Sequence, residues 1–597
     1  MCGIVGYVGR GEVVEVLLRG LRGLEYRGYD SSGIAVHDGR ELVVVKRAGR
    51  IANLERALEG TSLCGDAGIG HTRWATHGVA TDENAHPFLS SGGTFAVVHN
   101  GIVANYRELA SALSARGVTL SSDTDSEVIA HLMESRYEGD VLAAIRSAVA
   151  ELRGSYALAV LSACEPGVVY GIRRDSPLVV GKGRDGYFLC SDVSGIFDLC
   201  DEYCPLRNGE IVRLTAAGAE LFGADGVRRP LCFLAEREDA CEKGEKAGDR
   251  MLAEIREIPR SLCLGYDDFP REEIRSLLSE PWEDLLLLGC GSAYHAGLVC
   301  KGALREICGV EARAEIASEF LTSEPLVGPR TLAIVLSQSG ETADTLRAAE
   351  RVKSRGGRLL SICNVRSSSL VRSSDHVIVT RCGRECAVAA TKSYCAQVQA
   401  LLLFCLEYSD IKGKMASDKI AFLRRELAAL PEKAAEVVAE EGRFVRLAGE
   451  LKEAKAVFYL GRGLDYAAAR EGSLKLKEVS YLFSEAYPSG ELKHGTLALM
   501  ERGVYGVIVA TNPALYEKNA ATIAEISCRG ATPIVIAPPS LVSRYSVERS
   551  LPLPECPPLF SPILSAITMQ LLAYHTAKAR GCDPDRPRNL AKSVTVE

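Results

Sequence analysis

The feature that most constrains the fold is an internal repeat in the second half of the chain. The segment LGCGSAYHA at 288–296 matches LGRGLDYAA at 460–468, a shift of 172 residues, with the common frame LGxGxxYxA after an apolar run. Further along, AIVLS pairs with VIVAT and RLLSI pairs with TPIVI at similar shifts. Three matches in the same order predict two copies of one domain.

Each copy reads as an α/β domain. Apolar strands such as DLLLLG and TLAIVLS alternate with amphipathic helices, which is typical of a doubly wound parallel sheet. We expect the copies over 266–425 and 440–580. The GxG after the first strand is not a dinucleotide fingerprint, because the third glycine of GxGxxG falls at Tyr294 and Tyr466.

The first 235 residues follow another pattern. Short β-rich segments such as IVGYV, TFAVVHNG and YALAVL are broken by helical stretches around 11–24 and 124–151, which favours an α+β domain with stacked sheets and flanking helices. The charge-rich residues 236–265 are expected to be a linker. The apolar, β-branched end of the chain, 581–597, is expected to be a docked tail.

Charge and apolar content exclude several classes of function. Lys and Arg number 70 against 77 Asp and Glu, a net charge of −7, so nucleic acid and anionic membranes are not expected partners. No apolar run approaches the roughly 20 residues that span a bilayer. The start of the chain lacks a secretory signal, and the 20 cysteines are scattered without a CxxC. These features predict a cytoplasmic protein with buried thiols.

Cys2 is a candidate nucleophile. Removal of Met1 would leave a residue that carries both a thiol and a free α-amine, whose ordinary pKa of about 7.7–8.0 suits a general base near neutral pH. The following segment, GIVGYVG, is apolar and glycine-rich and suits a buried strand that holds the terminus in place. Taken by itself, however, a cysteine at position 2 is usually without function.

Polar clusters downstream supply the other groups that amide hydrolysis needs. Asn100 and Gly101 can donate N–H groups to an oxyanion, Arg73 can grip a carboxylate, and Asp125 can accept from an ammonium group. The alternative is ordinary turn chemistry, with HNG as a hairpin turn and DTD as a helix N-cap. The four histidines at 71, 77, 86 and 99 lack metal-ligand spacing, so no metal site is predicted.

Together, MCGIVGYVG, LEYRGYDSSGIAV, HTRWATHG, NAHP, HNG and SDTDSE resemble the glutaminase domain of the class II, N-terminal nucleophile, glutamine amidotransferases. The resemblance implies that Cys2 attacks the side-chain amide of glutamine and that Asn100 and Gly101 form the oxyanion hole. It also implies a set of glutamine-binding residues with Trp74 at the mouth of an ammonia path: Arg73, Trp74, Thr76, His77 and Asp125.

In the first α/β copy, the strand TLAIVL runs into Ser337-Gln-Ser-Gly-Glu-Thr342 and then a helix. Three hydroxyls, a glycine and a helix N-terminus can hold a phosphate without a basic residue. The alternative is a serine-rich N-cap. The second copy has Thr511-Asn-Pro-Ala here, and Pro513 removes a donor, so this copy is not expected to bind phosphate.

Three further segments carry reactive groups. In EGSLKLKEVS, Glu471, Lys475 and Glu478 share one helix face, either as an exposed ion-pair ladder or as part of a site. GELKHG places His494 between glycines, in a loop that can approach a ligand. Near the end of the chain, Lys592 lies in an apolar setting where a lysine could form a Schiff base.

These segments, with CGSAYHAG, EIASEF, VAATKSY and RNLAKSVTVE, resemble the sugar isomerase (SIS) domains of the glucosamine-6-phosphate synthase family, the isomerizing glutamine–fructose-6-phosphate aminotransferases. The resemblance covers nearly the whole chain. It implies glutamine and fructose 6-phosphate as substrates, no cofactor and a homodimer. The implied sugar contacts are Ser292, Ser337, Gln338, Ser339, Thr342, Val388 and Ala591.

The resemblance also implies chemical roles. His494 would help to open the sugar ring, Lys592 would form the Schiff base, and Glu478, assisted by Lys475, would move a proton from C1 to C2. Ala293 and Thr496 depart from the family pattern, and so does the linker, which lacks an expected aromatic–histidine pair around 247–250. Two alternatives stay open: amination of another phosphorylated sugar, and a sugar-phosphate sensor without catalysis. Retention of the reactive residues speaks against the sensor.

Overall fold

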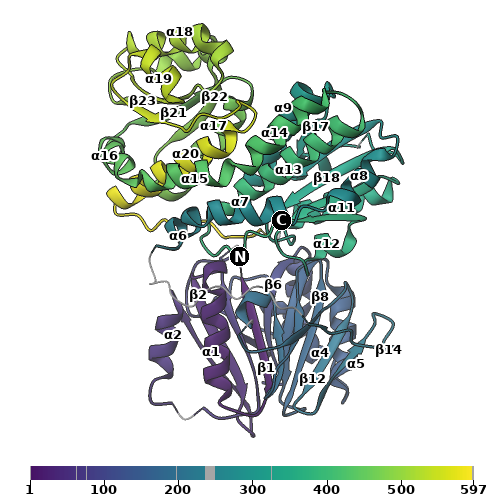
Figure 1. Ribbon diagram of the computed structural model, residues 1–597. Helices are drawn as coiled ribbons and strands as arrows, with labels where there is room; N and C mark the ends of the chain where they lie inside the picture. Colours follow the sequence, from purple (N-terminus) through teal and green to yellow (C-terminus); the bar gives the residue numbers. More distant parts are fainter. Residues whose placement is uncertain are drawn as a thin grey trace. The chain divides into compact units, whose positions relative to one another are not determined.

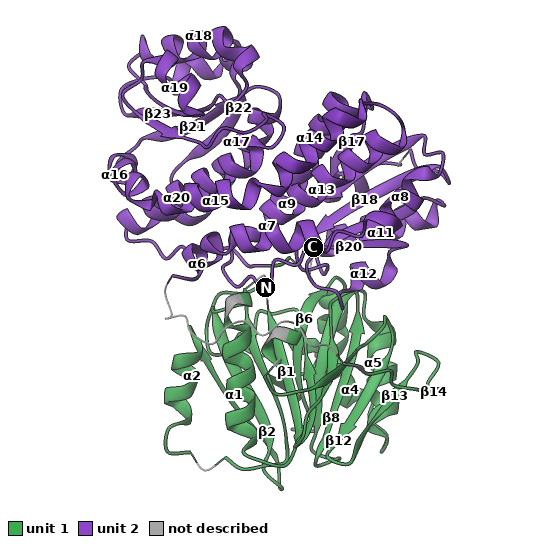
Figure 2. Cartoon of the chain, viewed as in Figure 1, with its two compact units in different colours: residues 1–238, 593–597 green, residues 239–592 purple. Residues whose placement is uncertain are grey.

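The computed structural model describes residues 2–61, 63–75, 77–196, 198–235, 249–324 and 326–594. They divide into two compact units, one within residues 1–238 and 593–597 and the other within 239–592 (Figure 2). No helix among the described residues has an apolar stretch long enough to cross a membrane.

The first unit contains two stacked antiparallel sheets with helices on both outer faces, as the sequence predicts (Figure 1). One sheet has the order β15-β11-β9-β10-β1-β4-β2-β3 and the other β14-β13-β12-β8-β7-β6-β5. Three hydrophobic clusters show the layers: one joins α1 and α2 to the first sheet, one fills the space between the sheets, and one joins the second sheet to α4 and α5.

The elements of this unit are β1 Gly3–Gly9, α1 Val13–Leu24, β2 Ser31–His37, β3 Leu42–Ala48, α2 Ile51–Leu58, β4 Ala67–Arg73, β5 Phe88–Leu89, β6 Phe95–Val103, α3 Tyr106–Ser114, α4 Glu127–Ser135, α5 Val141–Glu151, β7 Gly154–Ser162, β8 Val168–Arg174, β9 Val179–Lys182, β10 Gly186–Cys190, β11 Glu202–Pro205, β12 Ile211–Thr215, β13 Gly218–Phe222, β14 Arg228–Arg229 and β15 Leu234–Ala235. Two of these helices, α2 and α3, were not predicted from the sequence. The helical stretch expected over 124–151 is two helices that break at residues 136–140.

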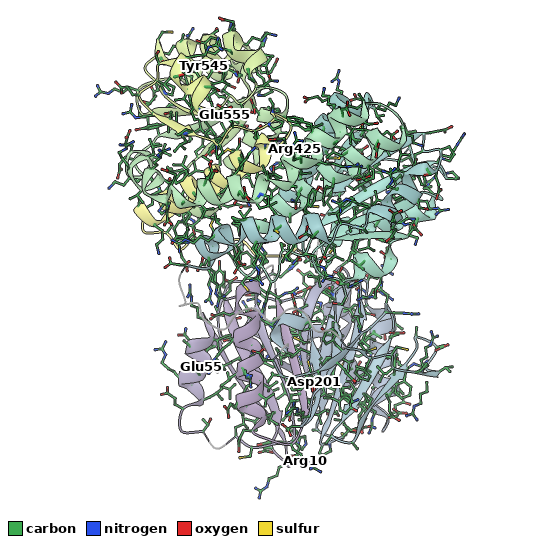
Figure 3. The ribbon with its side chains drawn as sticks, viewed as in Figure 1. Arg10, Glu55, Asp201, Arg425, Tyr545 and Glu555 are labelled. Atoms are coloured by element: carbon green, nitrogen blue, oxygen red, sulfur yellow. The ribbon has the colours of Figure 1, made fainter. Side chains whose placement is uncertain are left out.

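Cys2 directly precedes strand β1, at the end of an interior strand of the first sheet. Strand β1 pairs antiparallel with β4, with Gly3 opposite Thr72, so Cys2 lies level with Arg73, the last residue of β4. At the other end of β1, the side chain of Arg10 projects outward from the unit (Figure 3). The nucleophile candidate is therefore held by the central strand of a buried sheet.

The second unit contains the two α/β copies. Their sheets are entirely parallel and have the same strand order, β17-β16-β18-β19-β20 and β22-β21-β23-β24-β25, which is 2-1-3-4-5 within each copy. The second glycine of each LGxG has the same backbone conformation with positive φ, with φ 54° and ψ −125° at Gly291 and φ 59° and ψ −124° at Gly463. This agreement confirms the duplication.

The elements of the second unit are α6 Arg250–Arg256, α7 Ile258–Asp267, α8 Arg271–Ser279, β16 Asp284–Gly289, α9 Ser292–Ala303, β17 Arg313–Ile316, α10 Ala317–Leu321, β18 Thr331–Ser337, α11 Ala343–Ser354, β19 Arg358–Cys363, α12 Ser369–Ser373, β20 His376–Val379, α13 Lys392–Ile411, α14 Ser417–Ala428, α15 Leu430–Ala439, α16 Glu441–Leu451, β21 Ala456–Gly461, α17 Leu464–Ser480, β22 Ser484–Pro488, β23 Val504–Val509, α18 Tyr516–Ser527, β24 Thr532–Ala537, α19 Pro539–Tyr545, β25 Ser550–Pro552 and α20 Ser561–Ala579.

The linker expected over 236–265 differs from a plain connector. Residues 236–248 lie outside the described residues, but α6 and α7 follow at once and bury Met251, Ile255 and Leu262 in the same cluster as both α/β copies. The segment was expected to be a linker because it is rich in charge, but its apolar residues recur at helical spacing and so form a buried helix face. Helix α6 therefore belongs to the wall of the second unit.

Candidate functional sites

The sulfur of Cys2 lies at the end of β4. The backbone N–H of Trp74 donates to it at 3.3 Å, and the sulfur is 3.6 Å from the carbonyl oxygen of Trp74. Burial raises the pKa of the Cys2 thiol, although the Trp74 hydrogen bond and the nearby Arg73 guanidinium oppose this effect. The thiol therefore needs a base before it can act as a nucleophile. Met1 lies outside the described residues.

Asn100, on β6, is oriented by a histidine. The Nε2 atom of His71 is 3.0 Å from both the His99 carbonyl oxygen and Asn100 Oδ1, so Nε2 carries the proton and donates it. Burial lowers the pKa of His71 to about 3, which keeps the ring neutral. With Oδ1 used in this way, the Asn100 amide NH₂ faces Cys2 and donates to its carbonyl oxygen at 3.0 Å.

Gly101 follows Asn100 at a position that excludes a side chain. Its φ is 145°, and a Cβ atom would lie 2.0 Å from the carbonyl oxygen of Ser155 on the paired strand β7. A glycine is required here because the neighbouring backbone approaches too closely for any other residue. The structure thus brings Cys2, Asn100 and Gly101 to one edge of the first unit.

The residues expected to bind glutamine lie around this edge. Arg73 is buried, and its guanidinium donates to the carbonyl oxygens of His77, Gly78 and Val79. Asp125 is also buried and accepts from the backbone N–H of Val103 at 2.7 Å, so it does not serve as the N-cap of α4. Thr76 lies outside the described residues.

One residue at this edge was missed from the sequence. Asp30 Oδ2 accepts from the backbone N–H of Ala75 at 2.9 Å and so ties down the loop that carries Trp74. The signal was present in the GYDSS segment. The histidines at 71, 86 and 99 cluster here as buried rings, and among the described residues no group of three His, Cys, Asp or Glu side chains could hold a metal ion.

A cavity in the second unit collects residues from five segments of the chain, within 290–293, 336–345, 388–397, 475–478 and 590–592. It lies where the strand order reverses, between β16 and β18, which is the usual ligand position in such sheets. Of the predicted sugar-site residues, those that line the cavity are Ser292, Ser337, Gln338, Ser339, Thr342, Val388, Lys475, Glu478, Ala591 and Lys592, together with Ala293.

The loop between β18 and α11 presents its hydroxyl groups to the cavity. Ser337 Oγ accepts from the backbone N–H of Gly340 at 2.9 Å and lies 3.3 Å from Thr342 Oγ1. Thr342 occupies the N-cap position of α11 but makes no side-chain capping bond. In a simple serine-rich cap, the Thr342 hydroxyl would accept from a backbone N–H of α11. Because it does not, the loop is better explained as a binding site for a ligand.

Helix α17 brings a charged row into the protein interior. Lys475 Nζ lies 2.6 Å from Glu478 Oε2 and 3.4 Å from Glu471 Oε1, and both Lys475 and Glu471 are fully buried. Glu471 also accepts from Ser292 Oγ and contacts His295 Nδ1, both at 2.8 Å. Burial opposes a charged lysine, but the two carboxylates outweigh it and raise the pKa of Lys475. An exposed ion-pair ladder is thus ruled out.

The docked tail carries Lys592 into the cavity. Asp585 anchors the tail by accepting from the backbone N–H groups of Arg250 and Met251 at the start of α6, at 2.9 and 2.8 Å. The Lys592 ammonium group forms an ion pair with the fully buried Glu385. Glu385 was not predicted; an isolated acidic residue before the small, apolar CAVAATKSY run was the available signal. Residues 595–597 lie outside the described residues.

His494 is not brought to this cavity by its own chain. It ends a short 3-10 helix, Ser489–His494, is exposed, and is absent from the residues that line the cavity.

In the second α/β copy, a side chain occupies the position that corresponds to the hydroxyl-rich loop of the first copy. Asp465, at the position of Ala293, accepts from the backbone N–H and the hydroxyl of Thr511 at 2.9 and 2.5 Å.

Comparisons with known proteins identify the domains and the family of the chain. A family model for the SIS domain matches residues 280–406 and 450–579, and a model for a glutamine amidotransferase domain matches residues 71–198. The chain is 42% identical to the glutamine–fructose-6-phosphate aminotransferase (isomerizing) of Clostridium tetani over 609 residues, covering 100% of both. The enzyme of that name from a strain of Thermus thermophilus is 42% identical over 608 residues, again covering 100% of both.

Among solved structures, the C-terminal domain of glucosamine-fructose-6-phosphate aminotransferase from Francisella tularensis matches the chain with a TM-score of 0.56 and 33% identity. The match covers 58% of this chain and 100% of that domain.

Proposed function

The chain belongs to the isomerizing glutamine–fructose-6-phosphate aminotransferase family, and from this premise we propose how its residues carry out the reaction. The enzyme hydrolyses glutamine and transfers the released nitrogen to fructose 6-phosphate, with isomerisation to glucosamine 6-phosphate. The assignments below concern the residues that perform each step.

In the glutaminase reaction, Cys2 attacks the side-chain amide carbon of glutamine and forms a thioester. The α-amine freed by removal of Met1 takes the thiol proton, and Asn100 Nδ2 and the Gly101 N–H stabilise the oxyanion. Support for this role comes from the amide NH₂ of Asn100, which already faces Cys2. Arg73, Thr76, His77 and Asp125 bind glutamine, and Trp74 lies at the mouth of the ammonia path.

In the sugar reaction, the loop Ser337–Thr342 binds the phosphate, and Ser292, Val388 and Ala591 contact the sugar. Lys592 attacks the C2 carbonyl of the open ketose to form an imine, from which ammonia displaces the lysine. Glu478 then moves a proton from C1 to C2, assisted by Lys475. The observation that carries this assignment is the convergence of Lys592, Glu478 and the hydroxyl-rich loop on one cavity.

His494 opens the sugar ring in a second copy of the chain. Its exposed position, away from the cavity lined by its own chain, supports this arrangement and a homodimer. We also place the enzyme in the cytoplasm, because the scattered cysteines in the described part of the chain are free thiols, as expected in a reducing compartment. Sedimentation of the purified chain measures the oligomeric state directly, and a monomer with full activity would contradict the shared site.

The test of the reaction is an incubation with glutamine and fructose 6-phosphate, followed by measurement of glutamate and glucosamine 6-phosphate. Equal amounts of the two products are expected. Glutamate without glucosamine 6-phosphate would favour transfer to another phosphorylated sugar. Mass spectrometry of the active enzyme should show that Met1 has been removed, and an intact Met1 would overturn the proposed base.

A further inference from the structure

The ion pair between Lys592 and Glu385 raises a chemical question. An ammonium group has no lone pair, so Lys592 must lose a proton before it can attack a carbonyl carbon. Its partner Glu385 is buried and accepts from the Thr391 N–H at 2.9 Å, the Ser393 N–H at 3.0 Å and the Ser393 hydroxyl at 2.7 Å. A carboxylate with this many donors is a poor final acceptor for the proton.

A second carboxyl group lies behind the first. Glu254, on α6, is 5% exposed and accepts from the backbone N–H groups of Cys386 and Ala387 at 2.5 and 2.9 Å. The hydroxyl of Thr391 connects the two acids, because Thr391 Oγ1 lies 3.2 Å from Glu385 Oε1 and 3.3 Å from Glu254 Oε2. A continuous row of polar atoms therefore runs from Lys592 to Glu254.

The two acids differ in proton affinity. Burial alone would raise the pKa of Glu385, but Lys592 and the Ser393 donors reverse this and lower it to about 2. Burial, together with the neighbouring charge of Glu385, raises the pKa of Glu254 to about 7. Glu254 can therefore exchange a proton near neutral pH, whereas Glu385 stays ionised and transmits it.

We propose that Glu385, Thr391 and Glu254 form a buried relay that removes the proton from the Lys592 ammonium group before imine formation. This inference rests on the proposed role of Lys592 as the nucleophile. One N–H bond of the ammonium group breaks, Glu385 receives the proton and passes it to the Thr391 hydroxyl, and the hydroxyl's own proton goes to Glu254. The net change is ammonium plus carboxylate to amine plus carboxylic acid, with no change in oxidation state.

The other charged and titratable groups facing the relay do not exchange protons near neutral pH. Burial raises the pKa of the Cys382 thiol to about 12 and that of the Cys395 thiol well above its ordinary value. Burial opposes the charge of Lys475 and Lys392, but nearby carboxylates raise the pKa of both. Besides Lys592 itself, the groups whose charges interact with Glu385 or Glu254 are Lys475, Lys392, Cys382 and Cys395.

The experiment traps the imine with cyanoborohydride, using full-length enzyme and fructose 6-phosphate without glutamine, between pH 6 and 9. Mass spectrometry measures the rate at which the sugar is attached to the chain. Glu254→Gln keeps the size of the side chain, and we expect trapping at pH 7 to slow about tenfold or more, with the difference disappearing toward pH 9, where solvent base removes the proton. A trapping pH profile for Glu254→Gln that matches the wild type would overturn the relay.

Two controls separate proton transfer from structural damage. Glu272→Gln changes an exposed acid in the first turn of α8, outside the relay, and should keep the wild-type pH profile. Thr391→Val removes only the connecting hydroxyl and should reproduce the Glu254→Gln profile, while Thr391→Ser should restore the wild-type one. A Thr391→Val profile like that of the wild type would contradict the proposed path even if Glu254→Gln failed to fold.

Lys592→Arg distinguishes the relay from the proposed function. Loss of trapping in Lys592→Arg, combined with a wild-type profile in Glu254→Gln, overturns the relay and leaves the nucleophile assignment intact. Continued trapping in Lys592→Arg overturns the nucleophile and the relay together.

Discussion

Asp465 of the second α/β copy holds Thr511 through both its backbone N–H and its hydroxyl, at 2.9 and 2.5 Å. The first copy has Ala293 at the position of Asp465 and Ser337 at the position of Thr511, beside the open cavity. In the second copy a side-chain carboxylate thus binds this loop residue, whereas in the first copy Ala293 offers no such acceptor and both Ala293 and Ser337 line the cavity. This contact, more than the loss of a donor at Pro513, explains why the copies differ.

The Asp465 carboxyl should make stability depend on pH. Burial raises its pKa to about 6 from an ordinary value near 3.8, so the folded state binds the proton more tightly than the unfolded state. Its contribution to stability is therefore present below pH 4 and falls by about 3 kcal/mol as the pH rises to 6, at about 1.4 kcal/mol per pKa unit. Relative to wild type, Asp465→Asn should gain thermal stability between pH 4 and 6. A constant difference in Tm across that range would contradict the assignment.

Cys2→Ala should abolish glutamate release while imine trapping on Lys592 continues. In the proposed mechanism the two reactions use side chains of different units, and Cys2 serves only in the attack on the glutamine amide. Glutamate release and cyanoborohydride trapping measure the two halves separately. Cys64→Ala, which changes an exposed cysteine of the same unit, is the matched control and should keep both activities.

Asn100→Ala should lower kcat for glutamine hydrolysis by about 10²–10³ with little change in KM. Loss of a single oxyanion donor has an effect of this size because the donor acts mainly in the transition state. Steady-state glutaminase kinetics measure the change. Asn208→Ala, at an exposed contact with Asp175, should leave kcat unchanged. A large increase in KM with an unchanged kcat for Asn100→Ala would indicate a substrate-binding role instead.

Ala293→Ser should strengthen binding of fructose 6-phosphate. Ala293 lines the cavity next to the hydroxyl-rich loop, and one added hydrogen bond contributes about 0.5–1.5 kcal/mol. KM for the sugar phosphate should therefore fall roughly 2- to 12-fold, while KM for glutamine stays the same. A higher KM for the sugar would show that the added hydroxyl bonds within the protein, as Asp465 does in the second copy.

Glu478→Gln and Lys592→Arg should separate two steps of the sugar reaction. Glu478→Gln removes the base but leaves Lys592 in place, so imine trapping should continue while glucosamine 6-phosphate formation falls by about 10²–10⁴. Lys592→Arg should lose both trapping and product but keep basal glutaminase activity. Trapping, product formation and glutamate release are measured on each variant, and equal loss of all three would contradict this division.

Local sequence determined much of the architecture. The repeated LGxGxxYxA frame and two further matches in the same order predict two α/β copies, and Gly291 and Gly463 of the repeated frame have the same positive-φ backbone. The stacked sheets of the first unit follow from short alternating strands. Helices α2 and α3 were missed because they are short, and helices of about 8 or 9 residues depend on tertiary packing more than on propensity.

The amino-acid sequence by itself singled out Cys2, Asn100, Glu478 and Lys592 as candidates, because they stand in motifs that resemble a known family, and their chemical roles stay predictions. Only the tertiary structure decided their electrostatic surroundings. His71 orients Asn100 across 29 residues, Glu385 pairs with Lys592 across 207 residues, and Asp465 fills a loop 46 residues away. These contacts depend on which elements pack together and how completely they exclude water, and burial determines whether a carboxyl group is held as an ion or keeps its proton.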